Sequence, residues 1–292
     1  MANLFTDSFF RKQMGKIKAE LCIDEARLEN CAEIIEKRIA YVKDFNPETD
    51  SEEKDWPGFE RDVFHDLLGY KIKDDDPSDY HIFRQSKVKG AGKHGGTGKT
   101  DCTLGFYSKK KERDGNDPVM VEFKAPDTKN LDEAADQLWN YMTRHENCRW
   151  GIVSNFNEIT LYHRNRERDR KQTFYFAVPD KQKETASPLI RFLEKNKTED
   201  DSSKSACIAT DKDGNQYDYT ELTKFLAIFR KDRLICGQGK SRTEEMLEMQ
   251  GIEEKKIEKE FYEKYYRLRT DLFNEIALHN PPYRKKGRNW LP

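Results

Sequence analysis

Apolar side chains recur along the chain with two periods, one typical of helices and one typical of strands. Helical spacing of three and four residues occurs in residues 1–45, 57–69, 131–142 and about 243–279. Short apolar or alternating runs occur in residues 100–106, 119–125, 150–155 and 159–163. We assign to residues 57–165 the order of one helix, three strands, a second helix and two strands, of which four strands are the runs just named, and this order predicts an α/β fold.

The segments on either side of this central region divide the chain into three predicted parts. Residues 1–45 form an N-terminal helical segment, and an acidic, proline-containing linker covers 46–55. A core domain is predicted over 46–180, with an added edge strand at 173–178. Residues 181–292 are predicted to be a mainly helical connector that contains the long charged helix.

The composition favours a soluble, strongly solvated protein. Charged residues make up 37% of the 292 residues and hydrophobic residues 35%, which suits one good core with an appended domain better than a single large core. No segment resembles a signal peptide or a membrane span, and the six cysteines form no CxxC pair that would indicate a zinc site. We therefore expect a cytoplasmic protein without a membrane partner.

Two charged residues interrupt the apolar run of residues 119–125. Glu122 and Lys124 are two positions apart, so in a strand their side chains project from the same face. Burying such charges costs several kcal/mol each unless another interaction compensates, which favours a functional site. With a second carboxylate from Asp101 on the preceding strand, the set suits a hard divalent cation such as Mg²⁺ and the hydrolysis of a phosphodiester.

Asp101, followed by Glu122, Phe123 and Lys124, resembles the D…ExK signature of the PD-(D/E)XK nucleases, the superfamily of most restriction endonucleases. The resemblance implies a restriction-endonuclease-like αβββαβ core with a mixed central sheet, flanked by an N-terminal helical segment and a C-terminal helical connector. It also implies that Asp101, Glu122 and the carbonyl of Phe123 bind Mg²⁺, for which Mn²⁺ can substitute. Lys124 would then position the attacking water, and double-stranded DNA is the implied substrate.

The helix that precedes these strands carries a further acidic candidate. Pro57 and Gly69 are placed where helices commonly begin and end, so Glu60 is predicted in the first turn. There it resembles the acidic residue that many of these nucleases carry on the first core helix. An ordinary first-turn glutamate that complements the helix dipole explains the same position equally well.

The second helix carries Gln137 and Tyr141 one turn apart, next to its apolar stripe. The two residues resemble the QxxxY element that follows the ExK strand in the RecB-like branch of the superfamily and in type I restriction subunits, which implies a catalytic role. A partly exposed helix face is the alternative. The position directly after the strand that contains Glu122 favours the functional interpretation.

Two further segments resemble restriction-modification enzymes. The strands at 150–155 and 159–163, joined by an asparagine-containing turn, resemble the end of the nuclease core in type I subunits and type IIG enzymes. Residues 261–278 resemble the helical connector that leads into the methyltransferase domain of type IIG enzymes. The resemblance implies the N-terminal nuclease domain of a type IIG enzyme, or of a type I subunit, with methyltransferase and target-recognition domains outside this chain.

Basic residues gather between residues 81 and 113, where there are nine Lys and Arg against two Asp and Glu. The candidates for DNA contacts are Arg84, Lys87, Lys89, Lys93 and Lys99. The glycine-rich run at 89–100 is not a Walker A loop, because Gly92 lies one residue from the required position and the run leads into a strand. Phosphate contacts position a protein without reading bases, so we expect weak, salt-sensitive DNA binding with little sequence preference.

These observations predict a Mg²⁺-dependent DNA endonuclease, the cleavage module of a restriction-modification enzyme that acts in phage defence. The alternative is a nuclease-like DNA-binding or scaffolding module that does not cut. The presence of Asp101, Glu122 and Lys124 together favours the first prediction, because loss of any one of them would suffice to inactivate the site.

Overall fold

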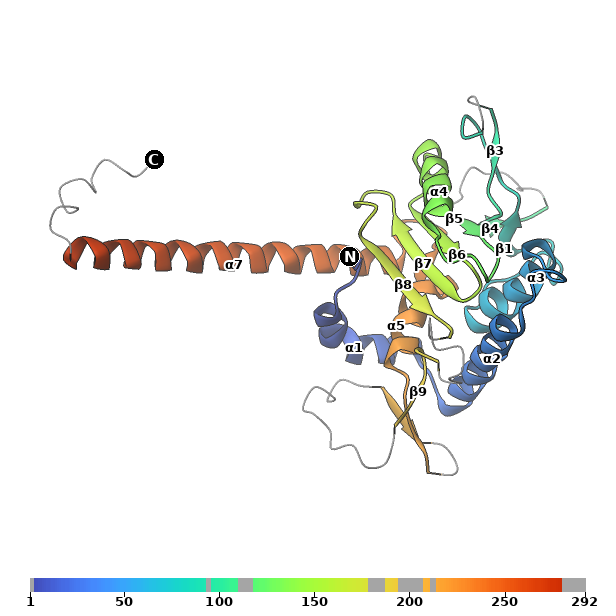
Figure 1. The fold of residues 1–292 in the computed structure, drawn as a ribbon, viewed down its shortest axis with the longest axis horizontal. Helices are drawn as coiled ribbons and strands as arrows, with labels where there is room; N and C mark the ends of the chain where they lie inside the picture. Colours follow the sequence, from blue (N-terminus) through green and yellow to red (C-terminus); the bar gives the residue numbers. More distant parts are fainter. Residues whose placement is uncertain are drawn as a thin grey trace. The chain divides into compact units, whose positions relative to one another are not determined.

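The computed structural model describes residues 3–92, 96–109, 118–177, 187–193, 207–210 and 214–279. The chain divides into two compact units, Met1–Glu245 and Met246–Pro292. The first unit holds the described strands and most of the helices (Figure 1). Within the described residues, no helix is both long and apolar enough to pass through a lipid bilayer.

A six-stranded mixed sheet forms the centre of the first unit (Figure 1). Its strands, in spatial order, are β1 (Tyr80–Arg84), β4 (Cys102–Tyr107), β5 (Val119–Phe123), β6 (Trp150–Ser154), β7 (Glu158–His163) and β8 (Lys171–Tyr175). β5 and β6 are parallel, and the other neighbouring pairs are antiparallel. The parallel pair needs a crossover, which α4 (Asp132–Arg144) supplies. The mixed sheet, the element order and the edge strand β8 confirm the predicted core.

Helices precede and follow the strands of this sheet along the chain. The helices of the first unit, besides α4, are α1 (Asp7–Leu21), α2 (Glu25–Asp44), α3 (Glu52–Phe59), η1 (Glu60–Leu67), α5 (Thr220–Phe229) and α6 (Lys231–Leu234). The last helix is α7 (Arg242–His279), which confirms the predicted long charged helix. α1 and α2 confirm the predicted N-terminal helical segment, and the apolar positions Cys31, Ile35 and Ile39 of α2 are buried.

The helix before the sheet begins earlier than predicted. α3 starts at Glu52, directly after Ser51, so the prediction of a linker throughout 46–55 was wrong. Acidic residues crowd the first turn, where they complement the positive end of the helix dipole and favour a helix start. Pro57 lies inside the helix, and the following turns of η1 have the wider π-helical geometry. Glu60 is therefore the first residue of η1, and the helical segment that contains it begins eight residues earlier, at Glu52.

Different helices cover the two faces of the sheet. α4 packs on one face, where Met120 of β5 joins Leu138 and Met142 of the helix in a buried cluster. On the opposite face, the ring of Phe123 contacts aromatic rings of α3 and η1. Alternation along β5 therefore places Met120 and Glu122 on the face of α4 and Phe123 on the face of α3.

A two-stranded ribbon extends the hairpin of β1 and β4. It consists of β2 (Lys87–Val88) and β3 (Gly98–Lys99), which pair antiparallel. At the junction, Gln85 has a positive φ of 56°, and its N–H donates to the carbonyl of Asp101 at 2.7 Å. Ala91, which follows β2, is linked to α4, because Asn140 Nδ2 of that helix donates to the Ala91 carbonyl at 3.2 Å.

The segment after the central sheet is less helical than predicted. It begins with a small three-stranded sheet of β9 (Arg191–Leu193), β10 (Ile208–Thr210) and β11 (Gln216–Asp218). Strands of three residues are too short to show a clear alternation, so sequence periodicity misses them. α5 follows, and its Phe225 packs on Phe174 of β8, so this segment adds to the core of the first unit.

Gly151 of β6 allows α4 to approach the sheet closely. A Cβ at this position would lie 2.7 Å from Leu138 Cδ2 and would also collide with Met142, both on α4. We expect Gly151→Ala to destabilise the fold by about 1–3 kcal/mol, because overpacking displaces the helix. Gly15→Ala in α1 is the matched control, since a Cβ there meets nothing within 4 Å. Urea unfolding measures the free energy of unfolding of both variants, and equal stability of the two would contradict the close packing of α4 on β6.

Candidate active site

The peptide unit of Phe123, at the end of β5, joins two of the predicted catalytic residues. Its N–H donates to Asp101 Oδ2 at 2.7 Å, and its carbonyl accepts a hydrogen bond from Lys124 Nζ at 2.8 Å. Continued by one residue, the antiparallel register of β4 and β5 places Asp101 opposite Glu122. The structure therefore brings Asp101, Glu122 and Lys124 together around one peptide.

Glu122 is buried, and its carboxyl group is only partly satisfied by hydrogen bonds. The residue is 1% exposed and shares a hydrogen bond with Asp101, whereas its Oε1 has no hydrogen-bond partner in the described part of the chain. Burial, followed by the negative charge of Asp101, raises the pKa of Glu122 to about 9. In the metal-free protein this carboxyl group therefore holds a proton at neutral pH.

Asp101 and Glu52 complete the acidic surroundings of Lys124. Burial raises the pKa of Asp101, although hydrogen bonding and the Lys124 ammonium oppose the shift. Burial also raises the pKa of Glu52, whose carboxyl group interacts electrostatically with Lys124 and Asp101. Sequence reasoning misses Glu52, because a helix start at Pro57 leaves it in a linker. The acidic run after Ser51 is the signal that locates a first helical turn there.

The donor atoms at the end of β5 fit a hard divalent cation with several open positions. Among the residues that the structure describes, no group of three or more His, Cys, Asp and Glu side chains could hold a metal ion. Asp101, Glu122 and the Phe123 carbonyl offer two carboxylates and one further oxygen, and Glu122 Oε1 lacks a partner. Mg²⁺ suits such a set, because it prefers oxygen ligands and retains waters or substrate phosphates at the remaining positions.

Gln137 and Tyr141 of α4 form a hydrogen-bonded pair beside the acidic residues. Gln137 Nε2 donates to the Tyr141 hydroxyl at 2.9 Å. Burial raises the pKa of Tyr141, Gln137 opposes the shift, and the charges of Glu122 and Asp101 add to it. The ribbon holds the tyrosine ring in place, since a Cβ at Gly98 would come within 2.5 Å of it. The fold thus places Tyr141 within electrostatic reach of the acidic pair.

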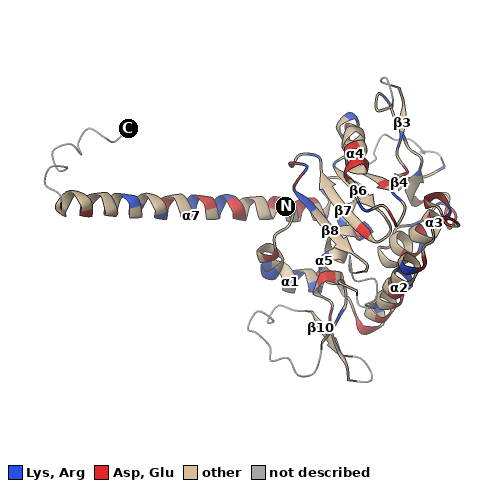
Figure 2. Cartoon of the chain, viewed as in Figure 1, with Lys and Arg blue, Asp and Glu red and all other residues tan. Residues whose placement is uncertain are grey.

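The β2–β3 ribbon carries three of the predicted DNA contacts. Lys87, Lys89 and Lys99 are exposed, and Lys87 lies directly opposite Lys99 in the antiparallel register. Like charges in a cross-strand pair repel each other, so this pair suits an anionic partner better than it suits the stability of the ribbon. Lys93 lies outside the described residues. Elsewhere in the first unit, acidic and basic residues are interspersed over the helices (Figure 2).

Glu60 and Arg84, the remaining predicted residues, form an ion pair with each other. Arg84 Nε donates to Glu60 Oε2 at 2.9 Å, and the guanidinium lies over the ring of Trp56. Burial raises the pKa of Glu60, and Arg84 opposes the shift. Glu52, in the preceding helix α3, interacts electrostatically with Lys124.

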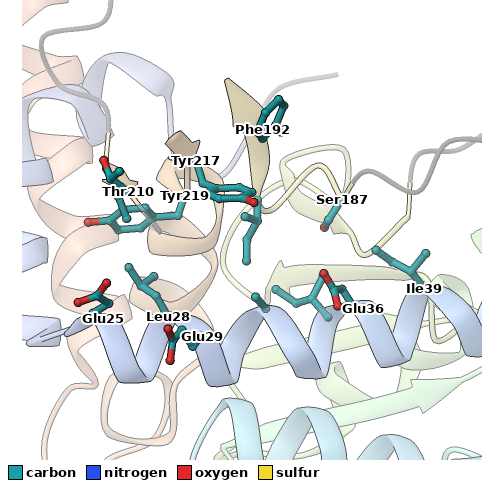
Figure 3. Close-up of a pocket in the computed structure, with 14 residues that line it drawn as sticks. Glu25, Leu28, Glu29, Glu36, Ile39, Ser187, Phe192, Thr210, Tyr217 and Tyr219 are labelled. Carbon is teal, nitrogen blue, oxygen red and sulfur yellow. The ribbon is translucent and has the colours of Figure 1, made fainter. Parts of the chain in front are cut away.

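A separate cavity of about 520 Å³ lies between α2 and the small sheet (Figure 3). Its walls are largely apolar, and Glu25, Glu29 and Glu36 of α2 also line it. None of the described site residues lines this cavity. Its carboxylates would repel a phosphate backbone, so the chemistry of DNA cleavage fits the end of β5 instead.

A mixed sheet with an acidic pair and a lysine at the end of a central strand, and with helices on both faces, defines a restriction-endonuclease-like module. The family model described as MmeI, N-terminal domain, matches residues 30–218, which is more than half of the chain. The chain belongs to this family, which confirms the resemblance to the N-terminal nuclease domain of a type IIG restriction enzyme. No curated protein and no solved structure matches the chain.

Proposed function

We propose that this chain is a metal-dependent endonuclease that hydrolyses phosphodiester bonds of double-stranded DNA. One observation carries the proposal: the Phe123 peptide holds Asp101 and Lys124 beside the buried carboxyl group of Glu122. Membership of the MmeI N-terminal domain family supports the same assignment, because it indicates a nuclease module of a restriction enzyme.

Asp101, Glu122 and the Phe123 carbonyl are the residues that would hold Mg²⁺, and Mn²⁺ can substitute. When bound, the ion supplies Lewis-acid polarisation of the phosphate and lowers the pKa of a water. Glu122 would release its proton to solvent when it binds the ion, because only the ionised carboxylate is a ligand. Lys124, held beside the same peptide, orients the attacking water and offsets the charge that develops on the phosphate.

Plasmid cleavage tests this function. We expect the chain to nick or linearise supercoiled plasmid with Mg²⁺ or Mn²⁺ and to leave it intact with EDTA. If the plasmid stays intact with both ions but is retarded in a gel, the chain is the non-cutting DNA-binding module instead. We assign sequence recognition to methyltransferase and target-recognition domains outside this chain, because the candidate DNA contacts are lysines that bind phosphates.

The lysine pair of the ribbon should control DNA affinity. Each phosphate contact releases about one counterion, so Lys87→Gln combined with Lys99→Gln should reduce the slope of log K against log salt by about two. The loss should be equal for all DNA sequences. Lys16→Gln, an exposed lysine of α1, is the control. Anisotropy titrations in EDTA at several salt concentrations measure the slopes, and an unchanged slope would remove the ribbon from the DNA interface.

Gln137→Ala should slow cleavage by about 10- to 100-fold and leave metal binding measurable. The amide fixes the Tyr141 hydroxyl, and misplacing a group beside the reacting phosphate typically costs this much. Tyr141→Phe isolates the role of the hydroxyl, because the ring that packs against Gly98 remains. Single-turnover cleavage and Mn²⁺ titration calorimetry measure the two effects. Wild-type rates in both variants would make the pair an ordinary helix surface.

A further inference from the structure

Glu60 begins a chain of contacts that ends at the active-site peptide. Its side chain is 5% exposed, and Oε2 accepts the hydrogen bond from Arg84 Nε at 2.9 Å. The Arg84 side chain is 46% exposed, so solvent reaches part of the guanidinium. A buried carboxylate needs a charged partner, because an unpaired buried charge is strongly unfavourable. Arg84 is therefore fixed in position by Glu60.

Arg84 in turn covers an aromatic side chain that touches the catalytic strand. Its guanidinium lies 5.2 Å from the centroid of the Trp56 ring, which is the distance of a cation–π contact. The Trp56 ring lies 5.6 Å from the ring of Phe123. Phe59 and Phe156 pack against Phe123 at 5.8 and 5.4 Å. The Phe123 ring is thus confined, and Trp56 is the neighbour that the ion pair holds.

The confined ring belongs to the residue whose main chain organises the site. The Phe123 N–H holds Asp101, and the Phe123 carbonyl holds Lys124. Trp56 also lies one helical turn after Glu52, so the same contact fixes the helix that carries the third carboxylate. A shift of Trp56 would therefore displace two neighbours of Lys124, namely the carboxyl group of Glu52 and the Phe123 peptide.

We infer that the ion pair of Glu60 and Arg84 is a positioning device for the active site: it holds Trp56 against Phe123 and so fixes the peptide that orients Asp101 and Lys124. This inference rests on the proposed nuclease function. In this role Glu60 contacts neither substrate nor metal. Arg84 binds Glu60, whereas the sequence predicts that it binds a DNA phosphate.

Three variants and one control test this role. Glu60→Gln and Arg84→Met break the pair, and the double variant measures their coupling. Arg61→Gln is the matched control, because Arg61 is the next residue of the helix and its pair with Asp75 is exposed. We expect each single variant to slow single-turnover cleavage at saturating DNA by about 10- to 100-fold, the cost of a misplaced catalytic group. The double variant should be no slower than either, since the residues act as one unit.

DNA affinity separates positioning from phosphate binding. In EDTA, Arg84→Met should leave the slope of log K against log salt unchanged. A slope reduced by about one, together with a wild-type cleavage rate, would make Arg84 a phosphate contact and overturn the inference. A wild-type protein that does not cut overturns the proposed function. A wild-type protein that cuts, with single variants that cut equally fast, overturns the positioning role alone.

A readout without catalysis completes the test. With 5-fluorotryptophan in place of its four tryptophans, the protein gives a ¹⁹F resonance for Trp56 that Trp56→Phe identifies. This resonance should shift in Glu60→Gln and in Arg84→Met and stay in place in Arg61→Gln. An unshifted Trp56 resonance in both pair variants would also overturn the inference, because Trp56 would then be held by other contacts.

Discussion

Replacing Lys124 with methionine should reduce the rate of DNA cleavage by about 10²–10³-fold, the effect typical of removing one group that stabilises developing charge. Its ammonium lies within 2.8 Å of the Phe123 carbonyl and interacts electrostatically with Asp101 and Glu122. Methionine keeps an unbranched side chain that is only one atom shorter, so the loss would mainly reflect the missing ammonium group. Stability should change by less than about 1 kcal/mol, because the side chain is only half-buried.

Lys129→Met is the matched control for this experiment, since Lys129 is an exposed lysine in the loop that follows the same strand. It should cut at the wild-type rate. Asp101→Asn should lose cleavage to a similar extent as Lys124→Met, and it should also lose Mn²⁺ binding in calorimetry. If Lys124→Met cut plasmid as fast as the control, with an unchanged circular dichroism spectrum, the assignment of the site would be wrong.

Patterns within a few residues are sufficient to predict the catalytic strand and the helix that covers it. Alternation along residues 119–124 predicts that Glu122 and Lys124 lie on the side opposite Phe123, and three- and four-residue spacing predicts the buried face of α4. These features depend on local geometry, which the sequence displays directly. For the same reason, Gln137 and Tyr141, one turn apart, come into contact as the helix forms.

Contacts between distant segments are not visible in the sequence. The hydrogen bond from the Phe123 N–H to Asp101 depends on the register of two strands, and Trp56 reaches Phe123 only after α3 has packed on the sheet. The start of α3 is a related case. Proline commonly occupies the first turn of a helix, so Pro57 predicts a helix start there and places Glu60 in the first turn. In the structure Pro57 lies inside α3, which begins at Glu52, so the prediction misses Glu52.

Metal-free Glu122→Gln should be more stable than the wild-type protein at alkaline pH. Burial and Asp101 raise the pKa of Glu122 to about 9 in the folded state, from an ordinary value of 4.5. Between about pH 4.5 and pH 9 the folded state must keep a proton that the unfolded state releases, so wild-type stability falls as pH rises. Below about pH 4.5 the penalty is absent, and above about pH 9 it no longer grows. Glutamine removes this titration while it keeps the shape of the side chain.

The gain in melting temperature of Glu122→Gln in EDTA should therefore be near zero at pH 5 and several degrees at pH 8, because about 1 kcal/mol corresponds to 2–4 °C in a domain of this size. Mn²⁺ should raise the melting temperature of the wild-type protein at pH 8 and have no effect on the variant, which lacks the ligand. Glu133→Gln, an exposed carboxylate of α4, should behave as wild type throughout. Differential scanning fluorimetry across this pH range measures all three proteins. A gain in melting temperature that stays constant with pH would show that Glu122 is ionised in the metal-free fold. It would also contradict the proposed release of a proton when the metal binds.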